Sequence, residues 1–338
     1  MKKIDTADAV GQVLCHDITE IVPGKFKGRA FKKGHIIREE DVEKLLSLGK
    51  DHIYIFEITE DELHENDAAL ILGKIGKGGN VELSTEIKEG KINFYSEVEG
   101  LLKVDKEHLF KLNMLGEISF ATLPENIPVK KGEMVAGARV IPLIIKRDKM
   151  DRAEEISSEK IIDILPFKKM RVGVVSTGNE IYYNRIVDKF GPVVKEKVEE
   201  YGCEVIGQII VPDDMEKIVE AGKNLLKKGA EMLVFTGGMS VDPDDLTPTA
   251  IMKMGGDLVS YGSPVLPGSM FLLSYIDDLP VMGLPGCVMY SKKTVFDLVL
   301  PRVLTGEKLT AEDIAGYGHG GLCQSCDVCR YPNCSFGK

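Results

Sequence analysis

The chain has 338 residues, of which 43% are hydrophobic and 28% charged, and its formal net charge is −10. This length and composition predict a globular protein of two or three domains, and the acidic balance argues against general nucleic-acid binding. No apolar segment approaches the roughly 20 residues of a membrane helix, and the first residues lack a signal peptide's apolar stretch, so we expect a cytoplasmic protein without membrane association.

The first half of the chain predicts two small domains. Residues 1–65 combine short alternating strands with one amphipathic helix, typical of a small α+β segment. Residues 66–165 begin with a connecting helix and then become β-rich, with short strands separated by Gly, Pro and Asn. The polar stretch 146–160 contains neither Gly nor Pro, and we expect a solvated helix there that crosses between domains.

Residues 166–306 change to a regular alternation of apolar strand, glycine turn and helix. Such alternation predicts an α/β domain with a doubly wound, mostly parallel sheet and helices on both faces. Three turns follow predicted strands of this domain: STGNE (176–180), TGGMSVDPDD (236–245) and LPGCVMY (284–290). Ligands bind beyond the carboxyl ends of such strands, so the three turns predict one cleft rich in backbone donors.

The middle turn suggests the chemistry of the ligand. A buried strand ends at Gly237 and Gly238, and the sequence predicts that Thr247 caps the next helix. Exposed backbone N–H groups at such a turn suit a phosphate. Three aspartates of the turn, Asp242, Asp244 and Asp245, would repel that phosphate unless a divalent cation lay between them. The pattern therefore favours a Mg²⁺-assisted site for a phosphorylated ligand, and the alternative is an ordinary solvated acidic turn.

The last segment, residues 307–338, is rich in cysteine. Cys323, Cys326, Cys329 and Cys334 follow the spacing C-x2-C-x2-C-x4-C. In a reducing cytoplasm this density favours metal ligation over disulfides. The alternative is a flexible, thiol-rich tail, because the segment has few apolar residues. We expect the tail to be separable, so that removing it after Gly318 leaves the α/β domain's stability nearly unchanged.

Together, the stretches VVSTGNEI, LVFTGGMSVDPDDLTPTA, SPVLPGSMF and VMGLPGCVMY resemble a known family. It is the molybdopterin-binding domain shared by molybdopterin molybdotransferases, molybdopterin adenylyltransferases and their relatives. The resemblance covers about residues 168–305 and implies the molybdopterin-binding fold. It also implies molybdopterin or its adenylate as ligand, Mg²⁺, molybdate as a further substrate, and a homo-oligomer, dimeric or trimeric. Molybdoenzymes that receive the cofactor would be partners.

The resemblance also implies roles for particular residues. Asp245 matches an acidic residue that serves as a metal ligand or catalytic carboxylate, and Asp242 is a second candidate for catalysis. The residues implied in ligand binding come from all three turns: Ser176, Thr177, Gly178, Asn179 and Glu180, then Thr236, Gly237, Gly238 and Ser240, then Pro285 and Gly286.

Three positions depart from the family pattern. Asn179 replaces an aspartate, and a neutral amide holds Mg²⁺ less strongly. Ser269 replaces a lysine expected to face phosphate or molybdate, and Cys287 replaces an asparagine at the cleft edge. The Cys287 thiol is either a soft metal ligand or a small buried side chain.

The tail has no counterpart in the core of that family. Its first three cysteines resemble the cluster-binding loop of bacterial ferredoxins, although the fourth spacing is longer and Asn333, not proline, precedes Cys334. An iron–sulfur cluster and a structural zinc ion both stay open.

Two functional hypotheses follow. The first is a molybdotransferase-like enzyme that inserts molybdate into molybdopterin with the help of Mg²⁺. The second is a non-catalytic carrier or sensor of molybdopterin with a metal-binding tail. Asn179 and Ser269 favour the second hypothesis, and Asp245 favours the first.

Overall fold

The computed structural model describes residues 2–22, 26–56, 59–156, 160–240 and 245–338. The chain divides into two compact units, and each contains several separate stretches of sequence. The first unit comprises Met1–Glu97, Val104–Leu123 and Gly132–Asp163, and the second comprises Val98–Lys103, Pro124–Lys131 and Ile164–Lys338.

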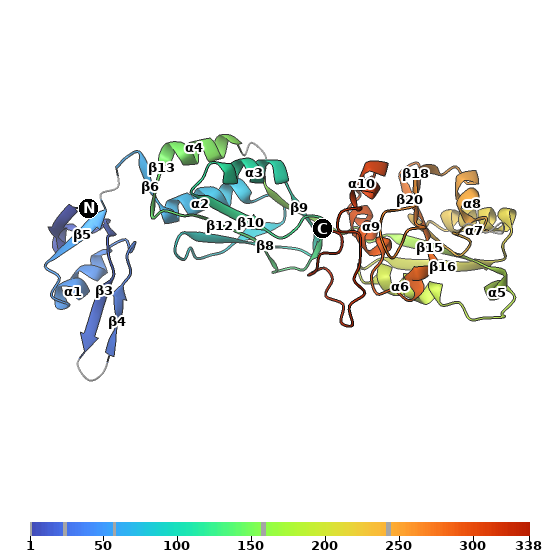
Figure 1. Cartoon of the computed structure of the whole chain (residues 1–338), viewed down its shortest axis with the longest axis horizontal. Coiled ribbons are helices and arrows are strands. Elements are labelled where there is room, and N and C mark those ends of the chain that lie inside the picture. The colour runs from blue at the N-terminus through green and yellow to red at the C-terminus, as the bar shows by residue number, and fades with distance from the viewer. Residues whose placement is uncertain (1, 23–25, 57–58, 157–159, 241–244) are drawn as a thin grey trace. The chain divides into compact units, whose positions relative to one another are not determined.

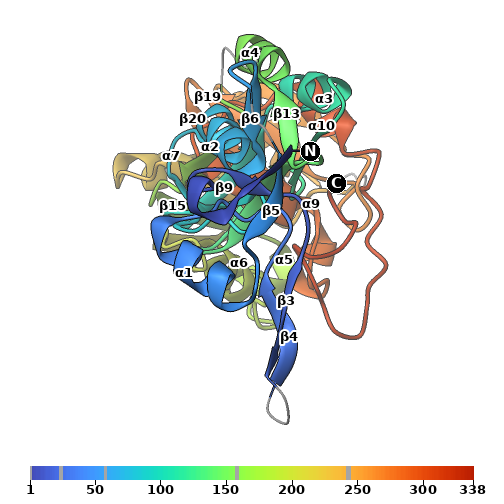
Figure 2. The same cartoon turned by 90° about the vertical axis from the view of Figure 1, so that its left-hand side faces the viewer.

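The first unit begins with a small α+β arrangement. Its elements are β1 (Lys2–Asp5), η1 (Thr6–Asp8), β2 (Val13–Leu14), β3 (Ile18–Val22), β4 (Phe26–Phe31), α1 (Glu39–Ser47) and β5 (His52–Phe56). Strands β1, β5 and β2 form one antiparallel sheet, and β3 and β4 form a hairpin that projects from it in both views (Figures 1 and 2). Leu45 of α1 is buried against Ile53 and Ile55 of β5, so one helix face closes this small core.

The stretch after it is β-rich, as predicted, but contains three helices. The strands are β6 (Glu62–His64), β7 (Val81–Leu83), β8 (Lys91–Ser96), β9 (Gly100–Val104), β10 (Ile118–Thr122), β11 (Pro128–Val129), β12 (Met134–Val140), β13 (Ile144–Lys146) and β14 (Ile162–Pro166). The helices are α2 (Glu65–Gly76), α3 (Lys106–Met114) and α4 (Arg147–Ile156). The sheet β10-β12-β8-β7 packs against α2, where Phe94 and Phe120 stack with ring centroids 5.0 Å apart. Helix α4 is not fully solvated, because Met150 and Ala153 are completely buried.

The second unit contains one six-stranded sheet. Its strands, in spatial order, are β16 (Glu204–Val211), β15 (Arg171–Thr177), β17 (Met232–Thr236), β20 (Leu279–Leu284), β19 (Leu272–Ile276) and β18 (Asp257–Tyr261). The first four are parallel to their neighbours, whereas β19 and β18 are added antiparallel. The sheet is therefore mostly parallel, and the predicted α/β class is confirmed.

Helices cover both faces of this sheet. They are α5 (Asn179–Tyr182), α6 (Phe190–Glu199), α7 (Met215–Lys227), α8 (Thr247–Lys253), the short η2 (Gly286–Met289), α9 (Val295–Leu304) and α10 (Ala311–Gly316). One core joins α6 and α9 to Met232 and Val234 of β17. The other core joins α7 and α8, which lie side by side (Figure 1), to Leu233 and Phe235 of the same strand. The alternating side chains of one buried strand thus fill both cores.

Two details of the sequence prediction change. The antiparallel strands β18 and β19 were not predicted, because Leu258 is exposed and β18 shows no apolar run. Helix α8 begins at Thr247, so Leu246 is its N-cap and Thr247 its first helical residue.

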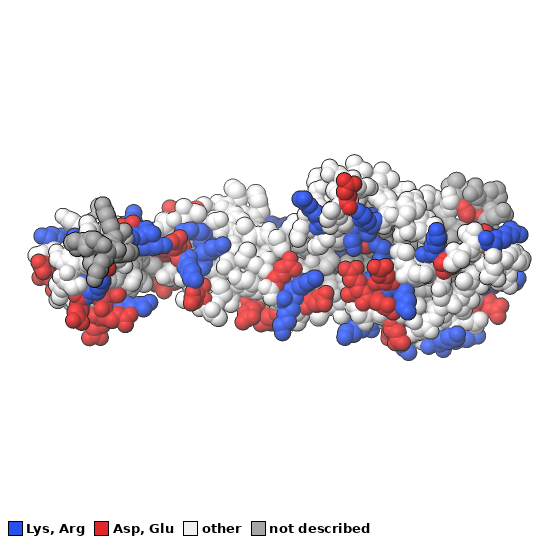
Figure 3. Space-filling model, turned by 90° about the horizontal axis from the view of Figure 1, so that it is seen from below, with Lys and Arg blue, Asp and Glu red and all other residues white. Residues whose placement is uncertain are grey.

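On the face shown in Figure 3, basic and acidic side chains alternate in small groups.

The expectation of a separable tail is wrong. Phe336 is only 3% exposed and belongs to the core that contains α9. The Tyr331 hydroxyl donates to the carbonyl of Asp297 at 3.2 Å, and Cys323 N donates to the carbonyl of Leu266 at 2.8 Å. Two aromatic side chains, Phe336 and Tyr331, and a backbone hydrogen bond therefore attach the tail to the second unit, although the segment lacks a periodic apolar pattern.

A buried cation connects α9 to the segment that follows it. The Arg302 guanidinium is almost fully buried, and it donates to Glu307 at 2.5 and 3.0 Å and to Asp313 at 2.6 Å. Burial alone would raise the pKa of Glu307, but the bonds from Arg302 outweigh it and hold that pKa below its usual 4.5. The pKa of Asp313 is also lowered, because bonds from Thr310 and Arg302 outweigh burial.

The tail packing predicts that Phe336→Ala destabilises the second unit by about 3–5 kcal/mol, since it removes a buried aromatic side chain. Val328→Ala is the control in the same tail, because Val328 is 74% exposed, and it should cost less than about 0.5 kcal/mol. Chemical denaturation of the full chain measures both. Equal, small effects of the two variants would show that the tail does not belong to the core.

The Arg302 cluster predicts acid sensitivity. A carboxylate whose folded pKa is lowered stabilises the fold above its unfolded pKa, and this stabilisation is lost as the pH falls through the folded value. Between about pH 5 and pH 3, the free energy of unfolding should therefore fall more steeply in the wild type than in Glu307→Gln. Glu312→Gln, at an exposed position, should follow the wild type. Parallel pH profiles for the wild type and Glu307→Gln would contradict this assignment.

Candidate ligand-binding site

The register of the central sheet aligns the three predicted turns. Ser176 of β15 pairs with Thr236 of β17, and Thr236 pairs with Leu284 of β20. These three strands are parallel, so the chain leaves the sheet at the same edge after Ser176–Thr177, after Thr236 and after Leu284. The three strands that precede the predicted turns therefore end at one edge of the sheet.

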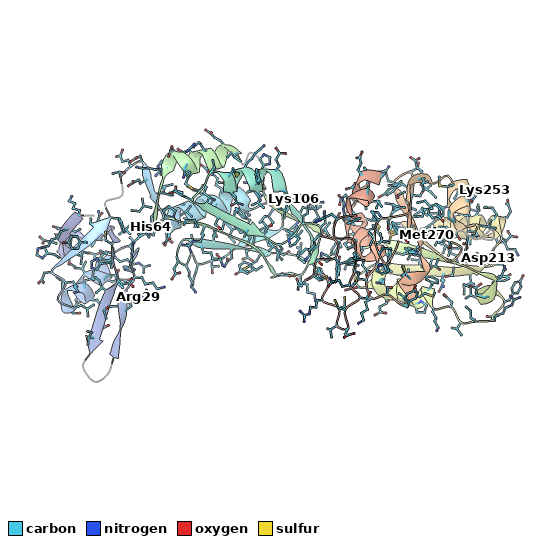
Figure 4. The ribbon with its side chains drawn as sticks, viewed as in Figure 1. Arg29, His64, Lys106, Asp213, Lys253 and Met270 are labelled. Carbon is cyan, nitrogen blue, oxygen red and sulfur yellow. The ribbon has the colours of Figure 1, made fainter. Side chains whose placement is uncertain are left out.

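A cavity of about 590 Å³ opens at this edge, within the size range of small-molecule sites. We call it the ligand cavity. Its lining comes from the second and third turns, from residues 266–270 and from α6. It consists of Phe190, Gly237, Gly238, Met239, Ser240, Asp245, Leu266, Pro267, Gly268, Ser269, Met270, Leu284, Pro285, Gly286, Cys287, Met289 and Tyr290. Figure 4 labels Met270 on this unit. Of the residues predicted to bind ligand, Gly237, Gly238, Ser240, Pro285 and Gly286 line the cavity.

The first turn lies beneath the cavity lining. Ser176 and Thr177 are buried. The Ser176 hydroxyl accepts from Thr236 Oγ1 at 3.1 Å and from Gln208 Nε2 at 2.8 Å. The Thr177 hydroxyl lies 3.2 Å from that of Thr247, which donates to the carbonyl of Gly237 at 2.8 Å. These hydroxyl groups, together with Thr236, fix the backbone of the second turn.

The rest of the first turn does not contribute to the lining. Gly178 has φ +144° and is buried at the start of α5. The backbone N–H of Asn179 donates to Asp213 Oδ2 at 2.9 Å (Asp213 is labelled in Figure 4), and Glu180 is exposed. None of these three residues lines the ligand cavity. All three turns follow strands that end at the same sheet edge, but only the second and third turns line the cavity.

The two glycines of the second turn are required by geometry. Gly237 and Gly238 have φ values of +85° and +56°, in the left-handed region that favours glycine. A Cβ at Gly237 would lie 2.1 Å from the carbonyl oxygen of Thr177, and one at Gly238 would lie 2.8 Å from Thr247 Oγ1. A side chain cannot fit at Gly237 without moving backbone. The turn thus presents bare main chain to the cavity.

The charge of the lining is unusual for an anion site. Among its residues, all within the described part of the chain, Asp245 has the one charged side chain, and there is no Lys or Arg. Ser269 occupies the position where the sequence comparison expected a lysine. Asp242 and Asp244 lie outside the described residues. A phosphate in this cavity would meet backbone amides and a carboxylate, so it would be held either by the amides alone or together with a cation that offsets the carboxylate charge.

Sequence reasoning missed Tyr261, a residue of the unpredicted strand β18. Its hydroxyl donates to the carbonyls of Met239 at 3.0 Å and Ser240 at 3.2 Å, and so fixes the chain that leaves the second turn. Burial, with the negative charge of Asp245, raises the pKa of Tyr261, which keeps the hydroxyl protonated as a donor. No signal in the sequence of β18 pointed to this role.

The remaining lining is soft and apolar. Met239, Met270 and Met289 supply thioethers, and Phe190 and Tyr290 supply aromatic rings. Burial raises the pKa of the Cys287 thiol. Cys287 is therefore protonated at neutral pH, as expected for a small apolar side chain rather than a reactive thiolate.

Two family models match parts of this chain. Residues 173–305 match the family described as a probable molybdopterin binding domain, and residues 3–57 match a domain of unknown function, DUF8806. Among the described residues, no helix has both the length and the apolar character needed to cross a bilayer.

Two relatives are named molybdopterin molybdenumtransferase. The protein of Haemophilus influenzae is 28% identical over 229 residues, which cover 62% of this chain and 54% of the relative. The protein of Staphylococcus epidermidis is 21% identical over 300 residues, which cover 84% of this chain and 66% of the relative. The chain thus spans about half the length of the first relative.

A solved structure of a molybdopterin biosynthesis MoeA protein from Pyrococcus horikosii is 17% identical. It matches 74% of this chain and 80% of its own chain with a TM-score of 0.33. Residues 173–305, which match the probable molybdopterin binding domain family, contain the three predicted turns and all the residues that line the ligand cavity.

Proposed function

We propose that the ligand cavity binds molybdopterin, free or as its adenylate, and that the chain acts in molybdenum cofactor assembly. The reaction would be the insertion of molybdate into molybdopterin, as in a molybdotransferase. The observation that carries this proposal is the joint presence of two bare glycine backbones and one carboxylate in a cavity at the carboxyl edge of the sheet. The family match of residues 173–305 supports the identity of the ligand.

The phosphate of the ligand would lie at the second turn. Backbone N–H groups of Gly237 and Gly238 are free of Cβ shielding and suit phosphate oxygens. Mg²⁺ is commonly held by one or two carboxylates together with substrate phosphates, and it keeps several waters. The single carboxylate of Asp245 in the lining fits that pattern, and Asp242 is the second candidate. Bound there, Mg²⁺ would offset the phosphate charge and polarise a phosphoanhydride.

This assignment implies that Mg²⁺ binds together with the ligand. Among the described residues, no three His, Cys, Asp or Glu side chains are grouped so that they could hold a metal ion. Asp245 alone would hold free Mg²⁺ weakly. The phosphate oxygens would complete the coordination, so ligand and Mg²⁺ should each increase the affinity for the other.

The pterin end of the ligand would contact the apolar lining. Phe190 and Tyr290 offer flat aromatic surfaces, and the thioethers of Met239, Met270 and Met289 are polarizable and adapt to irregular shapes. Such a surface suits a planar heterocycle with sulfur substituents. Ser269 and Ser240 add hydroxyl groups to this mostly apolar lining.

We assign the first turn a supporting role. Ser176 and Thr177 would hold the second turn through Thr236 and Thr247, without touching the ligand. The ligand would not contact Gly178, Asn179 or Glu180. The change from aspartate to Asn179 would then alter the cavity chemistry less than the change from lysine to Ser269.

The second candidate function is a non-catalytic carrier or sensor of molybdopterin. The absence of Lys and Arg from the cavity lining favours it, because transfer of an oxyanion is normally assisted by fixed positive charge. A single-turnover assay with molybdopterin, molybdate and Mg²⁺ separates the two. Bound pterin that acquires molybdenum identifies the enzyme, and bound pterin that does not identifies the carrier. Assembly as a dimer or trimer and delivery to molybdoenzymes are further proposals that rest on the family resemblance.

Asp245→Asn should remove the effect of Mg²⁺ on ligand binding. We expect molybdopterin to bind the wild type at least about tenfold more tightly with Mg²⁺ than without it, and to bind the variant equally in both conditions. Isothermal titration with and without Mg²⁺ measures this. Asp257→Asn, an exposed position on β18, is the matched control. A variant that keeps the full Mg²⁺ effect would refute the role of Asp245.

Tyr261→Phe should weaken ligand binding without unfolding the domain. It keeps the ring but removes two hydrogen bonds to the second turn, which we expect to cost about 1 kcal/mol, or about fivefold in affinity. Tyr182→Phe, on the exposed surface of α5, should bind like the wild type. Titration of both variants measures the difference. Unchanged affinity in Tyr261→Phe would show that the turn does not depend on this hydroxyl.

A further inference from the structure

The four tail cysteines belong to a loop that is closed at both ends. Gly337 N donates to the carbonyl of Gly320 at 2.9 Å, so the chain returns to its starting point after residues 321–336. We call these residues the cysteine loop. Near its start it pairs with Leu266, whose N–H donates to Gly321 and whose carbonyl accepts from Cys323, both at 2.8 Å. At its end Phe336 is buried in the core.

Closure places all four thiols around one space. Cys323, Cys326, Cys329 and Cys334 line a single hollow of about 430 Å³, and none of them forms a disulfide. The loop contains no helix and no strand. Cys326 and Cys329 are exposed and the other two are half-buried, and no three of these side chains are yet grouped around one point. Convergence of the four thiols on one centre would therefore require side-chain rotation, and no helix or strand of the loop stands in its way.

The walls of the hollow are positively charged. Lys292, Lys293 and Arg330 line it, against one carboxylate, that of Asp327. The ammonium of Lys292 binds the loop through the carbonyls of Cys326 at 3.2 Å and Asp327 at 2.5 Å.

Lys293 also lines the hollow, and it shares its carboxylate partner with a second lysine. Two ammonium groups share the buried carboxylate of Asp297, from Lys197 at 2.6 Å and from Lys293 at 3.1 Å. Counted against Asp297 alone, one positive charge is in excess at the wall of the hollow, where Glu200 is a further negative charge that acts on Lys293. Buried charge is normally compensated, so this wall suits a group with net negative charge.

We propose that the cysteine loop holds one metal centre through its four thiolates, in the hollow beside Lys292 and Lys293. Four thiols would each lose a proton and form one bond to the centre. Four thiolates around Zn²⁺, or around a [4Fe–4S]²⁺ cluster, leave a net charge of about −2, which the surrounding cations offset. Leu322, Tyr331 and Phe336 add apolar side chains to the lining of the hollow.

The two metals share the same thiolate chemistry, and the geometry favours the cluster. A zinc ion requires its sulfurs about 2.3 Å from one point, so all four thiols would have to converge closely. A cubane cluster holds its thiolates farther apart, as a hollow of this size allows. Three cysteines in the pattern C-x2-C-x2-C also match a cluster-binding loop.

Anaerobic purification of the full chain tests the proposal through metal analysis, acid-labile sulfide and the absorbance near 400 nm. We expect about four irons and four sulfides per chain with a broad absorbance band. About one zinc per chain without sulfide would show that the thiolates bind a zinc ion, and would refute the cluster. Less than a tenth of a metal centre per chain, with all four thiols open to alkylation, would overturn the site itself.

A double variant, Cys326→Ser with Cys329→Ser, distinguishes ligation from adventitious metal. Both residues are exposed, so the substitutions should leave the Phe336 packing intact, and the metal-free wild type and the double variant should unfold at nearly the same midpoint. The metal content should fall at least tenfold, whereas Cys287→Ser, outside the hollow, should keep the wild-type content. Retention of the metal by the double variant would contradict the proposal. Because the readout is metal content, the result does not depend on whether the ligand cavity binds molybdopterin.

Discussion

The site depends on one close approach of two backbones. The second turn packs its main chain at Gly237 against the carbonyl of Thr177 so tightly that no side chain can intervene. The hydroxyl groups of Ser176, Thr236, Thr177 and Thr247 link the same two turns. Without this contact the amides of Gly237 and Gly238 would not be held at the sheet edge, and the cavity would lose that part of its lining. The parallel register of β15, β17 and β20 makes the contact possible by ending all three strands in line.

Charge decides the chemistry that such a cavity can perform. The described residues of its lining include one carboxylate and no cation, so an anionic ligand would bring a metal ion or be held by backbone amides alone. Positive charge is instead concentrated at the hollow lined by the four tail cysteines, where Lys292, Lys293 and Arg330 face one carboxylate, that of Asp327. The two spaces share residues: Tyr290 lines both, and Leu266, which lines the ligand cavity, pairs with the cysteine loop through Gly321 and Cys323.

Much of the second unit could be predicted from sequence, because its central strands are uninterrupted apolar runs that stop at glycines. The runs 231–238 and 279–286 led directly to β17 and β20 and to two of the three turns that matter. Strand β18 was missed because its residues alternate poorly, and with it Tyr261 was missed. The first turn was placed at the correct edge, but only the sheet register shows that Ser176 and Thr177 support the lining from beneath. The sequence predicted a separable tail because a single buried aromatic residue, Phe336, does not produce a periodic pattern of apolar residues.

The central claim is that the cavity beside Gly237 and Gly238 binds molybdopterin with Mg²⁺. The most direct measurement is a crystal structure of the chain prepared with molybdopterin and Mg²⁺. We predict electron density for the phosphate at the amides of Gly237 and Gly238, a metal ion at Asp245, and the pterin against Phe190 or Tyr290. Ligand density at another place on the chain, or a cavity that stays empty at millimolar ligand, would contradict the account.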